Sequence, residues 1–369
     1  MLKVVRPSLK YQKKSTKGGS EMKARIIFVQ LLIVLVSGVT FINYAEPAEK
    51  PIEFSLSLPE AETGVMWQRG LKPWIDELSK RTGGRVKIVP YFNSSLVPFT
   101  EHYKAVEAGI VDLALTDSNT LPGMFPMQEI WSQVLPSTPY SRWGRIHWEI
   151  FNKFPEYKKE MPPVKILFTF SYGPATLGMS KKPIRSLEDA KGTKLMLIGK
   201  VSTDVMGALG FTPIPTWPAE FFTTIEKGVA DGTLLCRQTF FYEYSLAPYI
   251  KYVTDIHVAN TPFFMSLNMK KWDSLPPDVK QAFDELGGEW AADYFDKLYY
   301  QTTRVEGPAM MKNKYGTQII KLSPEELAKW DQRVRPLTDS FLNNLESKGL
   351  PAKKVFDEYN RLVQKYKME

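Results

Sequence analysis

The fold is decided by residues 186–232, which begin SLEDAKGTKLML (186–197) and end in EFFTTIEKGVADG (220–232). The spacing Glu-x5-Glu-x-Gly-x2-Asp in this second part also occurs 119 residues earlier, in EHYKAVEAGIVD (101–112). Two copies of one pattern predict two similar lobes. Chance similarity between two amphipathic helices that both end at glycine is the alternative.

Each copy has the features of a strand–helix–strand unit. Residues 101–107 and 220–226 are runs of helical length with apolar residues on one side, and each ends near a glycine that can adopt the left-handed conformation closing a helix. Strand candidates precede the two helices, at residues 85–91 and 211–215, and another strand follows each aspartate. Such units form right-handed crossovers between parallel strands. The sequence therefore predicts an α/β protein.

The positive charge of the chain is concentrated at its N-terminus. The formal net charge is +8, but residues 1–45 contain eight Lys or Arg and one acid, which leaves 40 basic and 39 acidic side chains elsewhere. A nearly neutral body lacks the basic footprint of a nucleic-acid-binding protein. No nucleic-acid partner is expected.

A basic head followed by an apolar run predicts an export signal. Met22 is the expected true start, and residues 26–42 are almost entirely apolar. Cleavage after Ala45 would release the protein into the periplasm. An uncleaved membrane anchor is the alternative, because Asn43 fits the small-x-small cleavage rule poorly.

The chain is expected to divide into four parts, which together form two lobes. The longest helical pattern runs from residue 278 towards 311, with kinks expected at Gly287-Gly288 and Gly307-Pro308, and is long enough to brace both lobes. The predicted parts are an extension with signal peptide (1–45), lobe 1 (46–165), lobe 2 (166–255), and a segment that returns through the hinge, completes lobe 1 and forms long C-terminal helices (256–369).

The sequence contains no recognised catalytic or metal-binding motif. His102, His147 and His257 lack metal-ligand spacing, and there is no nucleophile elbow, phosphate-binding glycine loop or cysteine pair. Cys236, the single cysteine, cannot form an internal disulfide and is expected to be a small buried residue. An exported two-lobed protein without these groups is predicted to be a binding protein with no catalytic residues, metal or cofactor.

Five short motifs follow one another in a fixed order. They are KPIRSLEDAKGTK (182–194), ALGFTPIP (208–215), the unit at 220–232, WDSLPP (272–277) and KGLP (348–351). On these motifs the chain, from about Ile52 to its C-terminus, resembles the solute-binding proteins of the tripartite ATP-independent periplasmic (TRAP) transporters.

This resemblance implies a fold and a role. The fold would be periplasmic-binding-protein-like, with two lobes joined by hinge strands, braced by a long helix and closed over one small organic solute. Its partners would be that solute and the membrane permease subunits, driven by an ion gradient. The alternatives are a binding protein with degenerate or altered ligand specificity that serves a sensor or another transporter class, and an exported enzyme using residues such as Glu60 and Asp117.

The chain departs from the family pattern at three positions. An arginine that grips the substrate carboxylate is usual where Met196 stands, a second arginine is common where Ala175 stands, and an asparagine is frequent where Leu235 stands. A carboxylate desolvated without a cationic partner costs several kcal/mol. We therefore expect a ligand with an apolar or aromatic body and atypical carboxylate recognition.

Arg237 offers a substitute for the missing arginines. It lies two residues beyond Leu235 on a predicted strand and should point to the same face. A surface or interlobe salt bridge is the alternative role. Closure of the lobes would complete the site, because each lobe supplies half of the contacts. Ligand contacts are also expected from residues at strand ends and in nearby aromatic segments, namely Trp67, Asp117, Asn119, Tyr172, Trp217 and Phe240.

Overall fold

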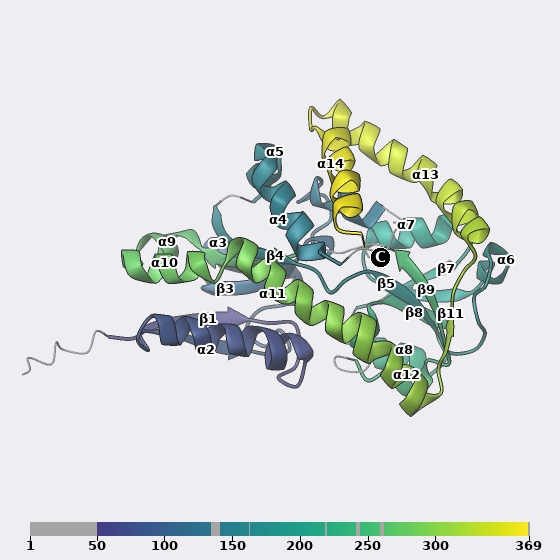
Figure 1. Cartoon of the computed structure of the whole chain (residues 1–369), viewed down its shortest axis with the longest axis horizontal. Helices are drawn as coiled ribbons and strands as arrows, with labels where there is room; N and C mark the ends of the chain where they lie inside the picture. The colour runs from purple at the N-terminus through teal and green to yellow at the C-terminus, as the bar shows by residue number, and fades with distance from the viewer. Residues whose placement is uncertain are drawn as a thin grey trace, which may run out of the picture. The chain divides into compact units, whose positions relative to one another are not determined.

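The structure is a computed structural model, and it describes residues 50–133, 141–161, 163–217, 220–240, 244–258 and 262–367. Residues 51–369 form one compact unit. Within it the strands make two separate sheets, with the orders β2-β1-β3-β10-β4 and β11-β9-β5-β8-β6-β7 (Figure 1). The predicted α/β fold with two lobes is confirmed.

The first sheet combines parallel and antiparallel pairs. Strand β1 lies parallel to both β2 and β3, and β10 runs antiparallel to β3 and β4. The elements of this lobe are β1 (Ile52–Ser57), η1 (Met66–Leu71), α2 (Lys72–Arg81), β2 (Val86–Tyr91), η2 (Phe99–Glu101), α3 (His102–Ala108), β3 (Leu113–Asp117), η3 (Ser118–Thr120), η4 (Gln128–Gln133), α4 (Trp143–Lys153), α5 (Pro155–Lys159), β4 (Val164–Phe170) and β10 (Phe263–Asn268).

The second sheet repeats this arrangement around β6. Strand β6 lies parallel to both β7 and β8, while β5 runs antiparallel to β8 and β9. The elements are β5 (Ala175–Met179), α6 (Leu187–Ala190), β6 (Lys194–Leu197), α7 (Lys200–Ala208), β7 (Thr212–Pro215), α8 (Phe221–Glu226), β8 (Gly232–Leu235), η6 (Arg237–Phe240), η7 (Ala247–Tyr249), β9 (Tyr252–Val258) and β11 (Gln318–Ile320).

The repeat seen in the sequence is confirmed by the topology. In each copy the chain passes from a central strand through a helix to one neighbouring strand, and through a second helix to the other neighbour. Gly109 and Gly228 have φ values of +74° and +67°. The amides that follow make matching bonds, Ile110 N–H to the Ala105 carbonyl and Val229 N–H to the Thr224 carbonyl. These bonds are typical of a helix closed by a left-handed glycine.

The aspartate of each repeat ties its strand to the central strand. Asp112 Oδ2 accepts hydrogen bonds from the Ser55 backbone N–H at 2.8 Å and the Ser55 hydroxyl at 3.0 Å. Asp231 Oδ2 accepts one from the Lys194 backbone N–H at 2.9 Å. Each aspartate stands one residue before the paired part of β3 or β8. The spacing shared by the two copies therefore places an aspartate at the same junction between the central and last strands of each repeat.

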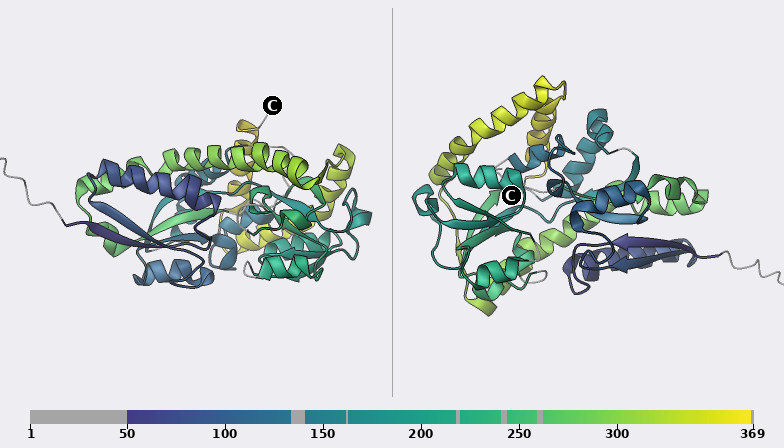
Figure 2. Two further views of the ribbon diagram at one scale, coloured as in Figure 1. Left: turned by 90° about the horizontal axis from the view of Figure 1, so that it is seen from below. Right: turned by 180° about the vertical axis from the view of Figure 1, so that it is seen from behind.

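A long helical segment extends along both sheets, as Figure 2 shows most clearly in its left view. Its predicted break at Gly287-Gly288 is real, because Gly288 has a φ of +52° and separates α10 from α11. At Gly307-Pro308 the helix type changes, because the π-helical segment ends at Glu306 and a new α-helix begins at Gly307 with Pro308 in its first turn. The segment comprises α9 (Met269–Asp273), α10 (Pro277–Glu285), α11 (Gly288–Tyr300), η8 (Gln301–Glu306) and α12 (Gly307–Tyr315).

Each sheet has its own hydrophobic core, and α13 (Pro324–Ser347) contributes to both. Trp330 and Val334 pack in the core of the second sheet, while Leu342 and Leu345 pack in that of the first. The last helix, α14 (Ala352–Lys365), completes the first core. No helix in the described part of the chain is both long and apolar enough to cross a membrane.

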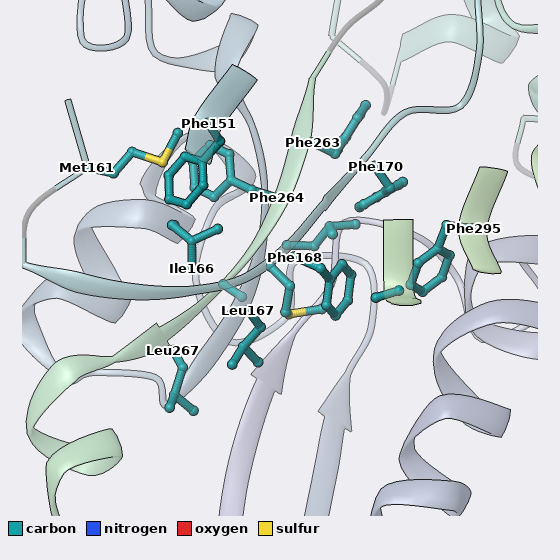
Figure 3. Close-up of a cluster of buried hydrophobic side chains, with 14 of the residues drawn as sticks. Phe151, Met161, Ile166, Leu167, Phe168, Phe170, Phe263, Phe264, Leu267 and Phe295 are labelled. Carbon is teal, nitrogen blue, oxygen red and sulfur yellow. The ribbon is translucent and has the colours of Figure 1, made fainter. Parts of the chain in front are cut away.

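Aromatic side chains of β4 fill the first core, as Figure 3 shows. Phe168 and Phe170 lie against Phe295 of α11, with ring centroids 5.1 and 5.3 Å apart. Both phenylalanines are fully buried. They therefore belong to the hydrophobic core of the first sheet. Tyr172 lies beyond the end of β4 and lines the cavity described below.

Replacing Gly228 by alanine should lower the free energy of unfolding by about 1 to 2 kcal/mol, because a Cβ disfavours the left-handed backbone there. Gly207→Ala is the matched control. Gly207 lies inside α7, where a Cβ would meet only Pro213 at 3.7 Å, and alanine should raise stability by about 0.5 to 1 kcal/mol. Urea denaturation measures both, and equal effects of the two substitutions would contradict this account.

Candidate ligand-binding site

A cavity of about 110 Å³ lies where the carboxyl ends of strands from both sheets meet. Four strands end at this cavity. They are the central strand of each repeat, β1 or β6, and the last strand of each repeat, β3 or β8. This is where open parallel sheets bind ligands. The described residues that line it are Pro59, Glu60, Phe99, Asp117, Ser171, Tyr172, Gly173, Ala175, Ile198, Ser202, Leu234, Leu235, Cys236, Thr239, Tyr244 and Phe263.

The walls of the cavity are mostly apolar. Phe99 and Phe263 come from the first lobe, and Ile198 and Leu234 come from the second. The polar lining residues include two acids, and the described lining contains no lysine, arginine or histidine side chain. Among the described residues, no group of three or more His, Cys, Asp or Glu side chains could hold a metal ion.

Glu60 and Tyr172 form a polar contact at the cavity. The Tyr172 hydroxyl donates a hydrogen bond to Glu60 Oε1 across the gap between lobe 1 and the connection 171–174. Burial raises the pKa of Glu60 to about 7, and the hydrogen bond from Tyr172 partly opposes that rise. An acid of this kind changes charge near neutral pH.

Tyr172 is held in place by the segments that join the two sheets. Its ring packs edge-on against Phe263 and Tyr299, with centroid distances of 4.6 and 4.8 Å. Its carbonyl accepts a hydrogen bond from the Thr303 hydroxyl of η8 at 3.3 Å. The next residue, Gly173, has a φ of +86° and lies against Trp143. The connection between the two sheets and the ligand site therefore share Ser171, Tyr172 and Gly173.

An outer groove of about 550 Å³ adjoins the cavity and shares Pro59, Glu60, Phe99 and Tyr244 with it. Trp217 lies along this groove and is 50% exposed. The structure therefore places Trp217 at the entrance of the site.

The structure brings four of the predicted ligand residues to the cavity and leaves three in the hydrophobic cores. Asp117, Tyr172, Ala175 and Leu235 line the cavity. The three others are not among its lining residues, because each is packed by its own lobe: Trp67 against Phe92, Met196 in the cluster with Phe221 and Ile225, and Phe240 over Gly178.

The strand argument for Arg237 is wrong. Strand β8 ends at Leu235, and Arg237 begins the 3-10 turn η6. The Thr239 N–H and hydroxyl both donate to the Cys236 carbonyl, at 3.1 and 2.6 Å, and this stabilises the turn. Alternation along a strand therefore does not apply to Arg237. The side chains of Arg237 and Asn119 lie outside the described part of the structure.

Sequence reasoning missed several lining residues. Glu60 was named individually only as a candidate residue of an exported enzyme, and Cys236 only as a buried residue, although both line the cavity. The position of Glu60 after the first strand was a usable signal, since β1 is the central strand of its repeat. No pattern in the sequence marked Phe99 at the start of η2, Phe263 at the start of β10 or Tyr244 after η6, which line the cavity.

Comparison with known proteins identifies the family. The profile described as bacterial extracellular solute-binding protein, family 7, matches residues 60–344. The C4-dicarboxylate-binding periplasmic protein of Rhodobacter capsulatus is 24% identical over 290 residues, covering 78% of this chain and 86% of that protein.

Two solved TRAP solute-binding proteins have the same fold. One, from a marine metagenome, is specific for aromatic acid ligands and holds metahydroxyphenylacetate; it is 22% identical, with a TM-score of 0.79 over 85% of this chain and 99% of that one. The other, from Rhodoferax ferrireducens T118, holds copurified benzoate; it is 19% identical, with a TM-score of 0.79 over 85% and 98% of the two chains.

The family profile covers most of this chain, and the two-lobed fold with a cavity at the strand ends agrees with it. The chain therefore belongs to the bacterial extracellular solute-binding proteins of family 7, the TRAP transporter receptors, which bind small organic solutes for transport and are not enzymes.

Proposed function

We propose that this protein is the periplasmic receptor of a TRAP transporter for a single-ring organic acid, which it delivers to the membrane permease. The observation that carries this proposal is the apolar wall of the cavity, where Phe99 and Phe263 face Ile198 and Leu234. Aromatic and aliphatic side chains favour an apolar ligand body, while a few polar groups orient it.

The size of the cavity supports a small ligand. Its volume is about 110 Å³. In another protein an apolar cavity of about 150 Å³ binds benzene. The cavity is therefore on the scale of a single ring, and the substituents of a ring acid would extend into the adjoining outer groove or require the lobes to open further.

The ligands bound by family members of similar fold support a carboxylic acid group on the ligand of this protein. Besides those with metahydroxyphenylacetate and benzoate, a TRAP solute-binding protein from Bordetella bronchiseptica holds mandelate. A carboxylate in an apolar cavity needs a cationic partner. Arg237 is our candidate, because its backbone lies between two lining residues, Cys236 and Thr239.

Transport would follow from closure of the two lobes. The ligand would contact lining residues from both sheets, such as Asp117 and Leu235, and so favour the closed form. The closed form would then dock on the permease. Export to the periplasm depends on the predicted signal in residues 1–45, which lie outside the described residues.

Benzoate and phenylacetate should bind and raise the melting temperature, whereas succinate and glucose should not. A ligand at 100 times its Kd stabilises the folded state by about 2.7 kcal/mol. Differential scanning fluorimetry followed by isothermal titration calorimetry measures this. Tighter binding of succinate than of any ring acid would contradict the proposal.

Arg237→Met should weaken benzoate binding by about thirtyfold or more, which corresponds to the loss of about 2 kcal/mol or more expected when a buried carboxylate loses its partner. Lys200→Met is the control, since Lys200 is exposed and pairs with Asp204. Calorimetric titration of both variants distinguishes the two effects. Unchanged affinity in Arg237→Met would exclude this residue as the carboxylate partner.

A further inference from the structure

The backbone that carries Glu60 is fixed by a strained turn. The Asn93 N–H donates to the Glu60 carbonyl at 2.9 Å, and the Ser94 N–H donates to the Leu58 carbonyl at 2.8 Å. Asn93 and Ser94 have φ values of +54° and +52°. Left-handed conformations at residues other than glycine cost of order 1 to 3 kcal/mol and concentrate at functional sites. The turn holds Glu60 at the cavity before any ligand arrives.

Only one oxygen of the Glu60 carboxyl group is satisfied. Oε1 accepts the hydrogen bond from Tyr172. Oε2 is shielded from solvent and has no hydrogen-bond partner among the described residues. A buried acceptor without a donor costs about 1 to 3 kcal/mol, and more when it is charged. The cavity therefore contains an acceptor that awaits a donor.

The described residues around Glu60 supply no second side-chain donor to its carboxyl group. The apolar rings of Phe99 and Phe263 are part of the same lining. The titratable groups that share the cavity with Glu60 are Tyr172 of the hinge, Asp117 at the end of β3, and Cys236 and Tyr244 after β8. Asp117 is another acid, and Oε2 of Glu60 is the buried acceptor that lacks a donor.

We propose that Glu60, positioned by Tyr172, accepts a hydrogen bond at Oε2 from a hydroxyl or amine substituent on the ring of the ligand. This inference rests on the proposed function and narrows the substrate class to ring acids that carry a hydrogen-bond donor. The apolar walls hold the ring, and the donor satisfies the carboxylate that the strained turn keeps in place. An analogue without a donor leaves this buried acceptor unpaired, which is the basis of strong discrimination.

The affinity of each hydroxybenzoate isomer should be compared by calorimetry with that of benzoate and of the methoxybenzoate of the same substitution pattern. At least one hydroxybenzoate should bind tenfold or more tightly than both, because a methoxy group has similar shape but no donor. The aminobenzoates distinguish an amine donor from a hydroxyl. Equal affinities for hydroxy, amino and methoxy compounds would overturn the inference while leaving the proposed function intact. Failure of every ring acid to bind would overturn both.

Variants test the assignment to Glu60. Glu60→Leu should remove the preference for the donor compound, so that the hydroxybenzoate and the methoxybenzoate of one substitution pattern bind with similar affinity. Tyr172→Phe should reduce the preference, because the positioning hydrogen bond is lost. Glu62→Gln is the control, since Glu62 is exposed and does not line the cavity, and it should keep the preference. A full preference in Glu60→Leu would overturn the inference.

The pH dependence of stability without ligand tests the burial of this acid separately. The pKa of Glu60 is raised from 4.5 to about 7, so ionisation should destabilise the folded state increasingly between these two pH values. Glu60→Gln should therefore melt at a higher temperature than the natural protein at pH 8, and the difference should shrink as the pH falls to about 4.5. A difference that is independent of pH would show that Glu60 is not held as a buried acid.

Discussion

The architecture depends on one repeated junction, in which an aspartate carboxylate accepts the backbone N–H of the central strand. Asp112 does this for β1 and Asp231 for β6. In each case a left-handed glycine three residues earlier ends the helix and turns the chain back towards the sheet. Because both repeats close in this way, both central strands end on the same side as their third strands. The two sets of strand ends can then face one cavity.

The connection between the lobes links the fold to ligand binding. The chain leaves the first sheet at the end of β4, passes through residues 171–174 and enters the second sheet at β5. Tyr172 lies in this connection, contacts Glu60 of the first lobe and receives a hydrogen bond from η8. A change in the angle between the lobes would move these contacts together. The site is therefore built from the segments that would move on closure, which is what a receptor with open and closed states requires.

The three departures from the family pattern have different physical meanings in the structure. Ala175 and Leu235 line the cavity and make it less polar. Met196 is instead completely buried beside Phe221 and Ile225, so hydrophobic packing fills the position where the family usually has an arginine. The polar lining residues include Glu60, an acid on the opposite lobe. If Glu60 accepts a hydrogen bond from the ligand as proposed above, the two lobes would recognise different ends of it.

The sequence by itself determined the α/β class and the twin crossover units with their strands, because these follow from short-range periodicity and from glycine and aspartate at fixed spacing. It also identified Asp117, Tyr172, Ala175 and Leu235 as residues near strand ends. Only the tertiary structure decided that Glu60 and Phe263 share a cavity with Leu235, and that Met196 and Phe240 do not. These outcomes depend on how the two sheets pack and on where a strand becomes a 3-10 turn, and long-range packing of this kind leaves no periodic signal in the chain.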